Sequence, residues 1–74
     1  MRARSNLVMS DDLERLIDAH GLAAVLYALS NICAEKATHI SASYSDETLA
    51  RMWRGAGVRV ANCAESRAVA LVTP

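Results

Sequence analysis

The 74-residue chain contains no phenylalanine, one proline, one tryptophan and two cysteines. A single proline leaves the chain almost free of helix breakers, and its apolar residues are mainly alanine, leucine and valine, a composition that favours helix over sheet. Two cysteines are too few for a disulfide framework. A chain this short forms one small domain, which buries only about 60% of the surface that it exposes when unfolded.

The chain also lacks net charge, because eight basic residues balance eight acidic ones. Proteins that bind nucleic acids through bulk electrostatics carry a basic surplus, so a nucleic-acid partner is not expected. No stretch has the pattern of a secretion signal, and the uncharged run 22–34 is shorter than the roughly 20 residues that cross a bilayer. We therefore expect a cytoplasmic protein without a membrane partner.

The stretch 22–40 organises the rest of the sequence. Its apolar residues recur at spacings of three and four, the pattern of one buried helix face. Ser10, followed by two aspartates, is a good N-cap for a preceding helix over about 11–20, which Gly21 ends. After a serine-rich break, Ser45 is placed to cap a third helix over about 46–69.

These patterns predict an all-α fold, a small three-helix domain over residues 10–74 that follows a flexible N-terminal segment, 1–9. A short loop joins the second and third helices, so they should form an antiparallel hairpin, with the first helix across one end. Gly55 and Gly57 each weaken the third helix by about 1 kcal/mol relative to alanine. They either kink this helix or allow another backbone to approach closely, and the small residues around them favour close packing.

The predicted core lies between the second and third helices, with the only tryptophan as its largest side chain. Its members share the inner faces of these two helices: Leu26, Leu29, Ile32, Cys33, Trp53 and Val60. The two cysteines fall about 15 Å apart along the hairpin, too far for a disulfide.

No residue pattern points to catalysis. Glu35 and His39 are four residues apart and offer two metal ligands, whereas a site needs three or four. Cys33 and Cys63 lie on apolar helix faces, far from the positive, partly exposed setting of a nucleophile. We therefore expect a protein that is not an enzyme, with no catalytic residue, no metal and no cofactor.

A protein-binding surface is predicted on the side of the central helix opposite its core face. Tyr27 projects there with small and amide neighbours, a composition typical of interfaces, although the first helix or the C-terminal tail could instead cover it. Arginines of the third helix, interleaved with glutamates, form a mixed polar face beside it. The candidate partner-binding residues are Ala24, Tyr27, Asn31, Arg51 and Arg54.

Three runs carry a resemblance to known sequences: LxxLIDxHGLAAVL at 13–26, ICAEKAxH at 32–39 and LAxxW at 49–53. Together they resemble a family of short, uncharacterised bacterial and phage helical proteins over roughly residues 12–54. The resemblance implies no catalytic residues. By association with small phage proteins it suggests an inhibitor that acts on a larger host complex, as anti-CRISPR proteins do. The sequence GAG at 55–57 departs from that family's pattern.

The central helix is apolar or neutral all round as far as Glu35, and such a helix is usually buried all round. Two short neighbouring helices can barely cover it. The predicted function is therefore a small non-enzymatic protein-binding module, whose partner is a host complex or a second copy in a homodimer. The resemblance further implies a phage or mobile-element inhibitor. The alternatives are a small DNA-binding transcriptional regulator and a purely structural homodimer.

Overall fold

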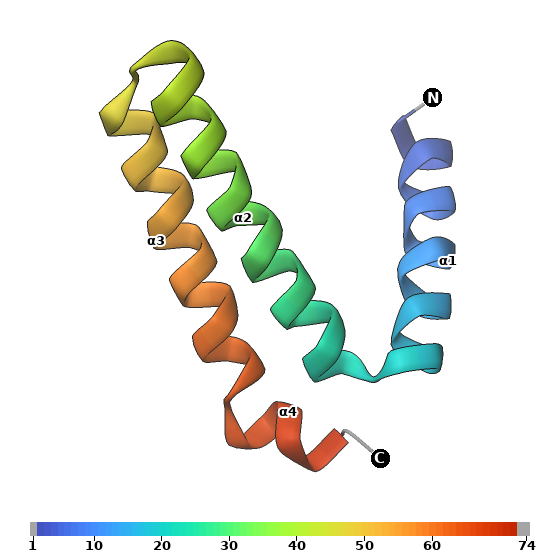
Figure 1. Cartoon of the computed structure of the whole chain (residues 1–74). Coiled ribbons are helices and arrows are strands. Elements are labelled where there is room, and N and C mark those ends of the chain that lie inside the picture. Colours follow the sequence, from blue (N-terminus) through green and yellow to red (C-terminus); the bar gives the residue numbers. More distant parts are fainter. Residues whose placement is uncertain (1, 73–74) are drawn as a thin grey trace.

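The computed structural model describes residues 2–72, and the side chains of residues 8–72. It contains four helices: α1 (Arg2–His20), α2 (Leu22–Tyr44), α3 (Glu47–Ala64) and α4 (Arg67–Val72). No strand occurs in this part of the chain. The prediction of an all-α fold is thus confirmed (Figure 1).

Two helix starts differ from the prediction. Helix α1 begins at Arg2, so Ser10 lies inside a helix and is not an N-cap. That residues 1–9 are flexible stays a prediction. Ser45 does not cap the third helix: it ends α2 in the left-handed conformation, with φ 53°. The N-cap of α3 is Asp46, whose carboxylate accepts a hydrogen bond from the Leu49 backbone N–H at 3.0 Å.

The predicted third helix, 46–69, is divided in two. Helix α3 ends at Ala64, and Ser66 begins α4 by accepting a hydrogen bond from the Val69 backbone N–H at 3.3 Å. Serine side chains compete for backbone donors in this way, which favours helix ends over helix interiors. The glycines at 55 and 57, by contrast, lie within α3 and do not end it.

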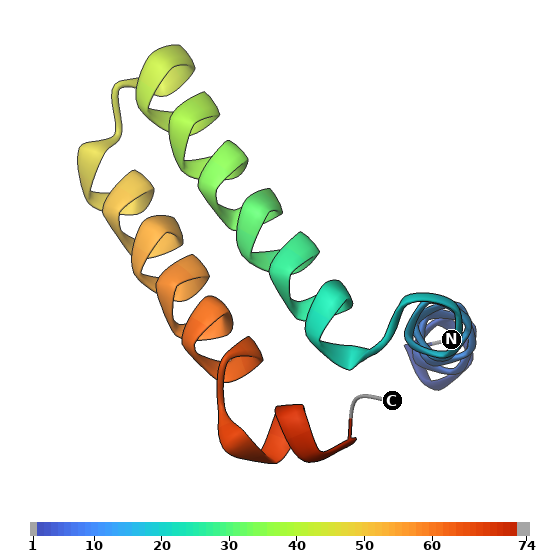
Figure 2. The same ribbon diagram turned by 60° about the horizontal axis from the view of Figure 1, so that its bottom comes forward.

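Small residues let α2 and α3 approach closely along their length, as both ribbon views show (Figures 1 and 2). Ala37 of α2 and Ala50, Gly57 and Ala64 of α3 are buried. The Ser30 hydroxyl of α2 donates to the Gly57 carbonyl oxygen at 2.8 Å. Alanine and glycine in this seam, rather than large side chains, therefore set the distance between the two helices.

The extents of the molecule are 40 × 35 × 16 Å. Its helices do not lie in one plane, because α1 is seen end-on in the view in which α2 and α3 run lengthwise (Figure 2). The chain turns through 117° between Val8–His20 and Leu22–Tyr44, so α1 diverges from the other helices (Figure 1). Of the helices described, α1 contacts α2 alone.

None of the large side chains that the structure describes is fully buried. The largest buried hydrophobic residue among those described is Val69. Of the predicted core, Leu26, Cys33, Trp53 and Val60 are half-buried. Leu29 and Ile32, which we expected in the core, are exposed at 39% and 47%, because they point away from α3.

Candidate protein-binding groove

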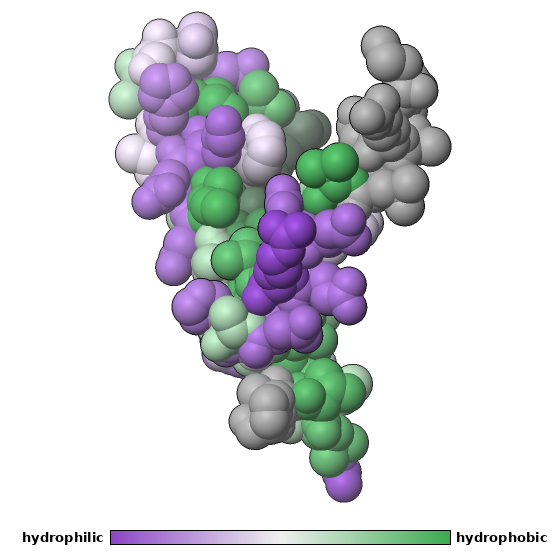
Figure 3. Space-filling view, turned by 90° about the vertical axis from the view of Figure 1, so that its right-hand side faces the viewer, coloured by the Kyte–Doolittle hydropathy of each residue, from purple (hydrophilic) through white to green (hydrophobic). Residues whose placement is uncertain are grey.

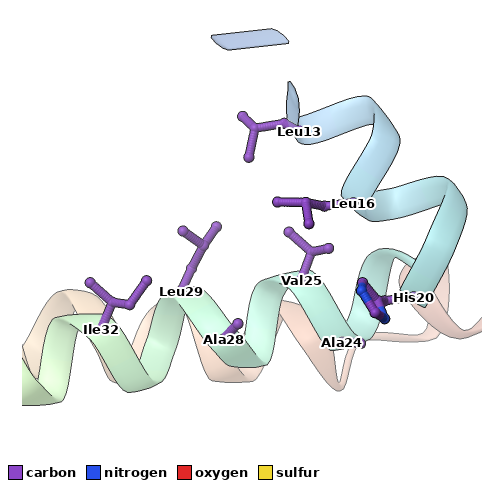
Figure 4. Close-up of a pocket in the computed structure, with 8 residues that line it drawn as sticks. All are labelled: Leu13, Leu16, His20, Ala24, Val25, Ala28, Leu29 and Ile32. Atoms are coloured by element: carbon purple, nitrogen blue, oxygen red, sulfur yellow. The ribbon is translucent and has the colours of Figure 1, made fainter. Parts of the chain in front are cut away.

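An apolar groove lies in the angle between α1 and α2, with a cavity volume of about 350 Å³. Leu13 and Leu16 of α1 point toward Val25 and Leu29 of α2, and the space between them is open (Figure 4). Among the residues whose side chains the structure describes, the lining is Leu13, Leu16, His20, Ala24, Val25, Ala28, Leu29 and Ile32.

The local sequence explains why the groove forms. On α1, Leu13, Leu16 and His20 follow helical spacing and share one face. Gly21 then makes the corner at φ 90° and ψ 154°, a conformation essentially restricted to glycine. Its backbone N–H donates to the Ile17 carbonyl oxygen at 2.7 Å, which ends α1 immediately before the turn. The apolar faces of both helices consequently face the same space.

The groove is lined mainly by hydrocarbon side chains. Its only polar lining side chain is the imidazole of His20, at the closed end (Figure 4). Leu16, Leu29 and Ile32 remain 39–47% exposed, so the groove is accessible from solvent. On the face of the molecule nearest α1, hydrophobic surface is interspersed with hydrophilic side chains (Figure 3). An apolar groove of this kind suits the apolar face of another helix.

A second, shallower apolar surface lies on α3. Leu49, Met52, Trp53 and Ala56 line a depression of about 330 Å³. Met52 is 65% exposed and Leu49 is 42% exposed. This surface provides a matched comparison for the groove, because it offers similar side chains on a different helix.

The structure does not gather the predicted partner-binding residues into one site. Ala24 lines the groove, whereas the Tyr27 hydroxyl donates to a Glu65 carboxylate oxygen at 3.0 Å, at the far end of α3. Asn31 is exposed on α2, and Arg51 and Arg54 are exposed on α3. That all five bind a partner stays a prediction, and of these five only Ala24 lines the groove.

Tyr27 is 41% exposed, and its contact is with the segment after α3 rather than with α1. The hydrogen bond to Glu65, with smaller effects of desolvation and of the negative charge of that carboxylate, raises the pKa of the Tyr27 hydroxyl. The side chain is thus held in its neutral form as a link between α2 and the end of α3.

Most groove residues were not predicted as a binding site. Val25, Leu29 and Ile32 belong to the apolar periodicity of the central helix, which we assigned to one core face. Leu13 and Leu16 lie three residues apart, a spacing that fits an apolar helix face as well as the wall of a groove. One feature of the sequence indicates such a groove: the central helix carries more apolar residues than one neighbouring helix can cover.

No cluster of three or more His, Cys, Asp and Glu side chains that could hold a metal ion occurs among the described residues. Glu35 and His39 border a solvent-facing depression with Ile32 and Lys36. The half-buried Cys33 and the exposed Cys63 are both free thiols.

Within the described part of the chain, no single helix is both long enough and apolar enough to span a membrane. Val8–His20 and Leu22–Tyr44 meet that criterion only when the two bent segments are counted together. Comparison of the whole chain with protein families, curated proteins and solved structures finds no match.

Proposed function

We propose that this protein is a small non-enzymatic module that binds another protein chain in the apolar groove between α1 and α2. The observation that carries the proposal is a solvent-accessible groove lined by seven hydrocarbon side chains and one imidazole. Such a lining offers contact area for leucine-like anchors and no paired acid and base for chemistry. An amphipathic helix, with anchors at spacings of three and four, is the ligand that this shape fits best.

The arrangement of the helices supports this role. We infer that α2 and α3 form an antiparallel hairpin that serves as a rigid support, because small residues and the bond from Ser30 to Gly57 hold them together. Helix α1, set at an angle to one end of this hairpin, supplies the second wall of the groove. The α2 wall of the groove thus belongs to the rigid hairpin and does not have to be ordered on binding, which lowers the entropic cost of binding.

The sequence suggests two classes of partner. One is a host complex, as for a phage or mobile-element inhibitor of the anti-CRISPR kind, and it stays a prediction carried by the sequence resemblance alone. The other is a second copy of the chain. Both require the same groove, so the binding site can be tested before the partner is known.

The test compares Ile32→Glu with Met52→Glu. Both place one carboxylate on an exposed apolar position, the first in the groove and the second on the α3 surface. We measure capture of host proteins by the immobilised chain and self-association by light scattering, after circular dichroism has shown that each variant is helical. We expect Ile32→Glu to lose the partner and Met52→Glu to retain it. If the two variants behave alike in both assays, the groove is not the binding site.

A further inference from the structure

Helix α1 carries an apolar stripe that the chain itself leaves largely uncovered. Met9 and Leu16 are 55% and 47% exposed, and they share a helix face with Leu13. The helix contacts only α2, and the other described helices do not touch it. Most helical stability in proteins comes from packing of an apolar face. The described residues leave much of this face of α1 open to a partner.

The solvent-accessible area of the chain indicates how much surface a partner would have to cover. The chain exposes 5854 Å², whereas a compact monomer of 8.0 kDa exposes about 4,450 Å². The excess is about 1,400 Å², and a standard protein interface buries about 800 Å² on each partner. The radius of gyration agrees, at 14.4 Å against about 11 Å for a compact domain of this length. An interface that removed this excess from both copies would bury about 2,800 Å² in total, which is in the range of obligate homodimers, about 2,000–5,000 Å².

We propose that the partner in the groove is a second copy of this chain, whose α1 lies between α1 and α2 of the first, in a two-fold symmetric dimer. This inference rests on the proposed function, because it names the occupant of the same groove. Each copy then supplies the apolar helix that the other groove needs, and both uncovered α1 stripes are buried by one contact.

The charges of α1 permit this contact. By the helical repeat, Asp12 and Glu14 lie about a quarter turn to either side of Leu13, whereas Asp11 and Asp18 lie on the opposite side of α1. Asp11 and Asp18 therefore stay in water when the apolar stripe is buried. The chain as a whole has no net charge, so two copies do not repel each other through their overall charge.

The first experiment is size-exclusion chromatography with light scattering over a range of concentrations. We expect the wild type to have twice the 8.0 kDa chain mass. Leu16→Glu and Ile32→Glu each bury a carboxylate in the apolar contact and should weaken association by about 100-fold or more. Met52→Glu, the control, should leave the mass unchanged. A wild-type monomer, or dissociation by the control variant alone, overturns the proposal.

The second experiment uses only the wild type, so it does not depend on whether a variant folds. Hydrogen exchange is measured at concentrations above and below the midpoint of dissociation. We expect the amides of residues 8–20 to lose protection on dilution, while those in the α2–α3 seam change much less, because only α1 depends on the partner. Equal protection of α1 at both concentrations contradicts the proposal.

The two experiments also separate this inference from the proposed function. A wild-type monomer that binds a host protein through Ile32, but not through Met52, refutes the dimer and supports the groove. A dimer that neither Leu16→Glu nor Ile32→Glu weakens refutes both the assignment of the second copy to the groove and the argument from uncovered area.

Discussion

Gly55 and Gly57 lie two residues apart in α3, and replacing each by alanine should change stability in opposite directions. Gly57 is buried in the seam with α2, where a Cβ atom would lie 3.0 Å from Cys33 Cβ and 3.2 Å from the Ser30 carbonyl oxygen. Gly55 has no atom within 4 Å of the position that its Cβ would take. Comparison of the two alanine variants therefore separates the effect of helix propensity on stability from the effect of packing.

The magnitudes follow from these distances. Alanine is better than glycine inside a helix by about 1 kcal/mol, which is the whole expected gain for Gly55→Ala. At Gly57 the same gain is opposed by overpacking, which costs about 1–3 kcal/mol where neighbours are rigid. Both neighbours here are rigid, since one is the root of a side chain and the other is backbone. We expect Gly57→Ala to be net destabilising by about 1 kcal/mol, the middle of that range less the helix gain.

Thermal unfolding followed by circular dichroism at 222 nm measures both effects at one protein concentration. For a domain of this size, 1 kcal/mol corresponds to a change in Tm of about 4–8 °C. We expect Gly55→Ala to raise the Tm and Gly57→Ala to lower it. A rise of equal size in both variants would show that α2 and α3 are farther apart than the seam requires, and the packing argument would fail.

Four further predictions concern single side chains or turns. Asp46→Ala removes the N-cap of α3 and should lower the free energy of unfolding by about 1 kcal/mol, measured by urea denaturation. Gly21→Ala forces alanine into φ 90° and should destabilise the fold, whereas Ser45→Gly relieves a φ of 53° and should stabilise it by up to about 1 kcal/mol, both read from the Tm. In a variant without the other tyrosine, absorbance at 295 nm should show Tyr27 with a pKa above the ordinary value near 10, because its hydroxyl donates to Glu65. Its contribution to stability should be complete below pH 10 and lost as the pH rises through the raised pKa, and Glu65→Gln should lower that pKa; no shift in either direction would contradict the hydrogen bond.

The helical class and the close seam were readable from the sequence, because both depend on local composition. Alanine-rich segments without proline form helices wherever they pack, and Gly57 among small residues indicated a close approach that the structure confirms. The helix ends were less predictable. Ser45 and Asp46 are both good N-cap residues, and only the backbone shows that the first ends α2 while the second begins α3.

The site was harder to predict, since periodicity marks an apolar face without showing what covers it. Tyr27 was expected on a free face or beneath a neighbouring element, and the partner that holds it, Glu65, lies 38 residues along the chain. No spacing rule connects two residues so far apart. The same limit applies to Leu29 and Ile32, whose spacing fits a core as well as it fits the wall of a groove.

The seam and the groove have one physical origin. Ala50, Gly57 and Ala64 recur every seven residues, so they place the smallest side chains of α3 against α2. A contact built from small residues brings the backbones close but covers little apolar area, because few methyl groups are buried for each turn of helix. Val25, Leu29 and Ile32 of α2 line the groove toward α1 instead. The close seam between two helices thus leaves on α2 an apolar face that α1 covers only in part.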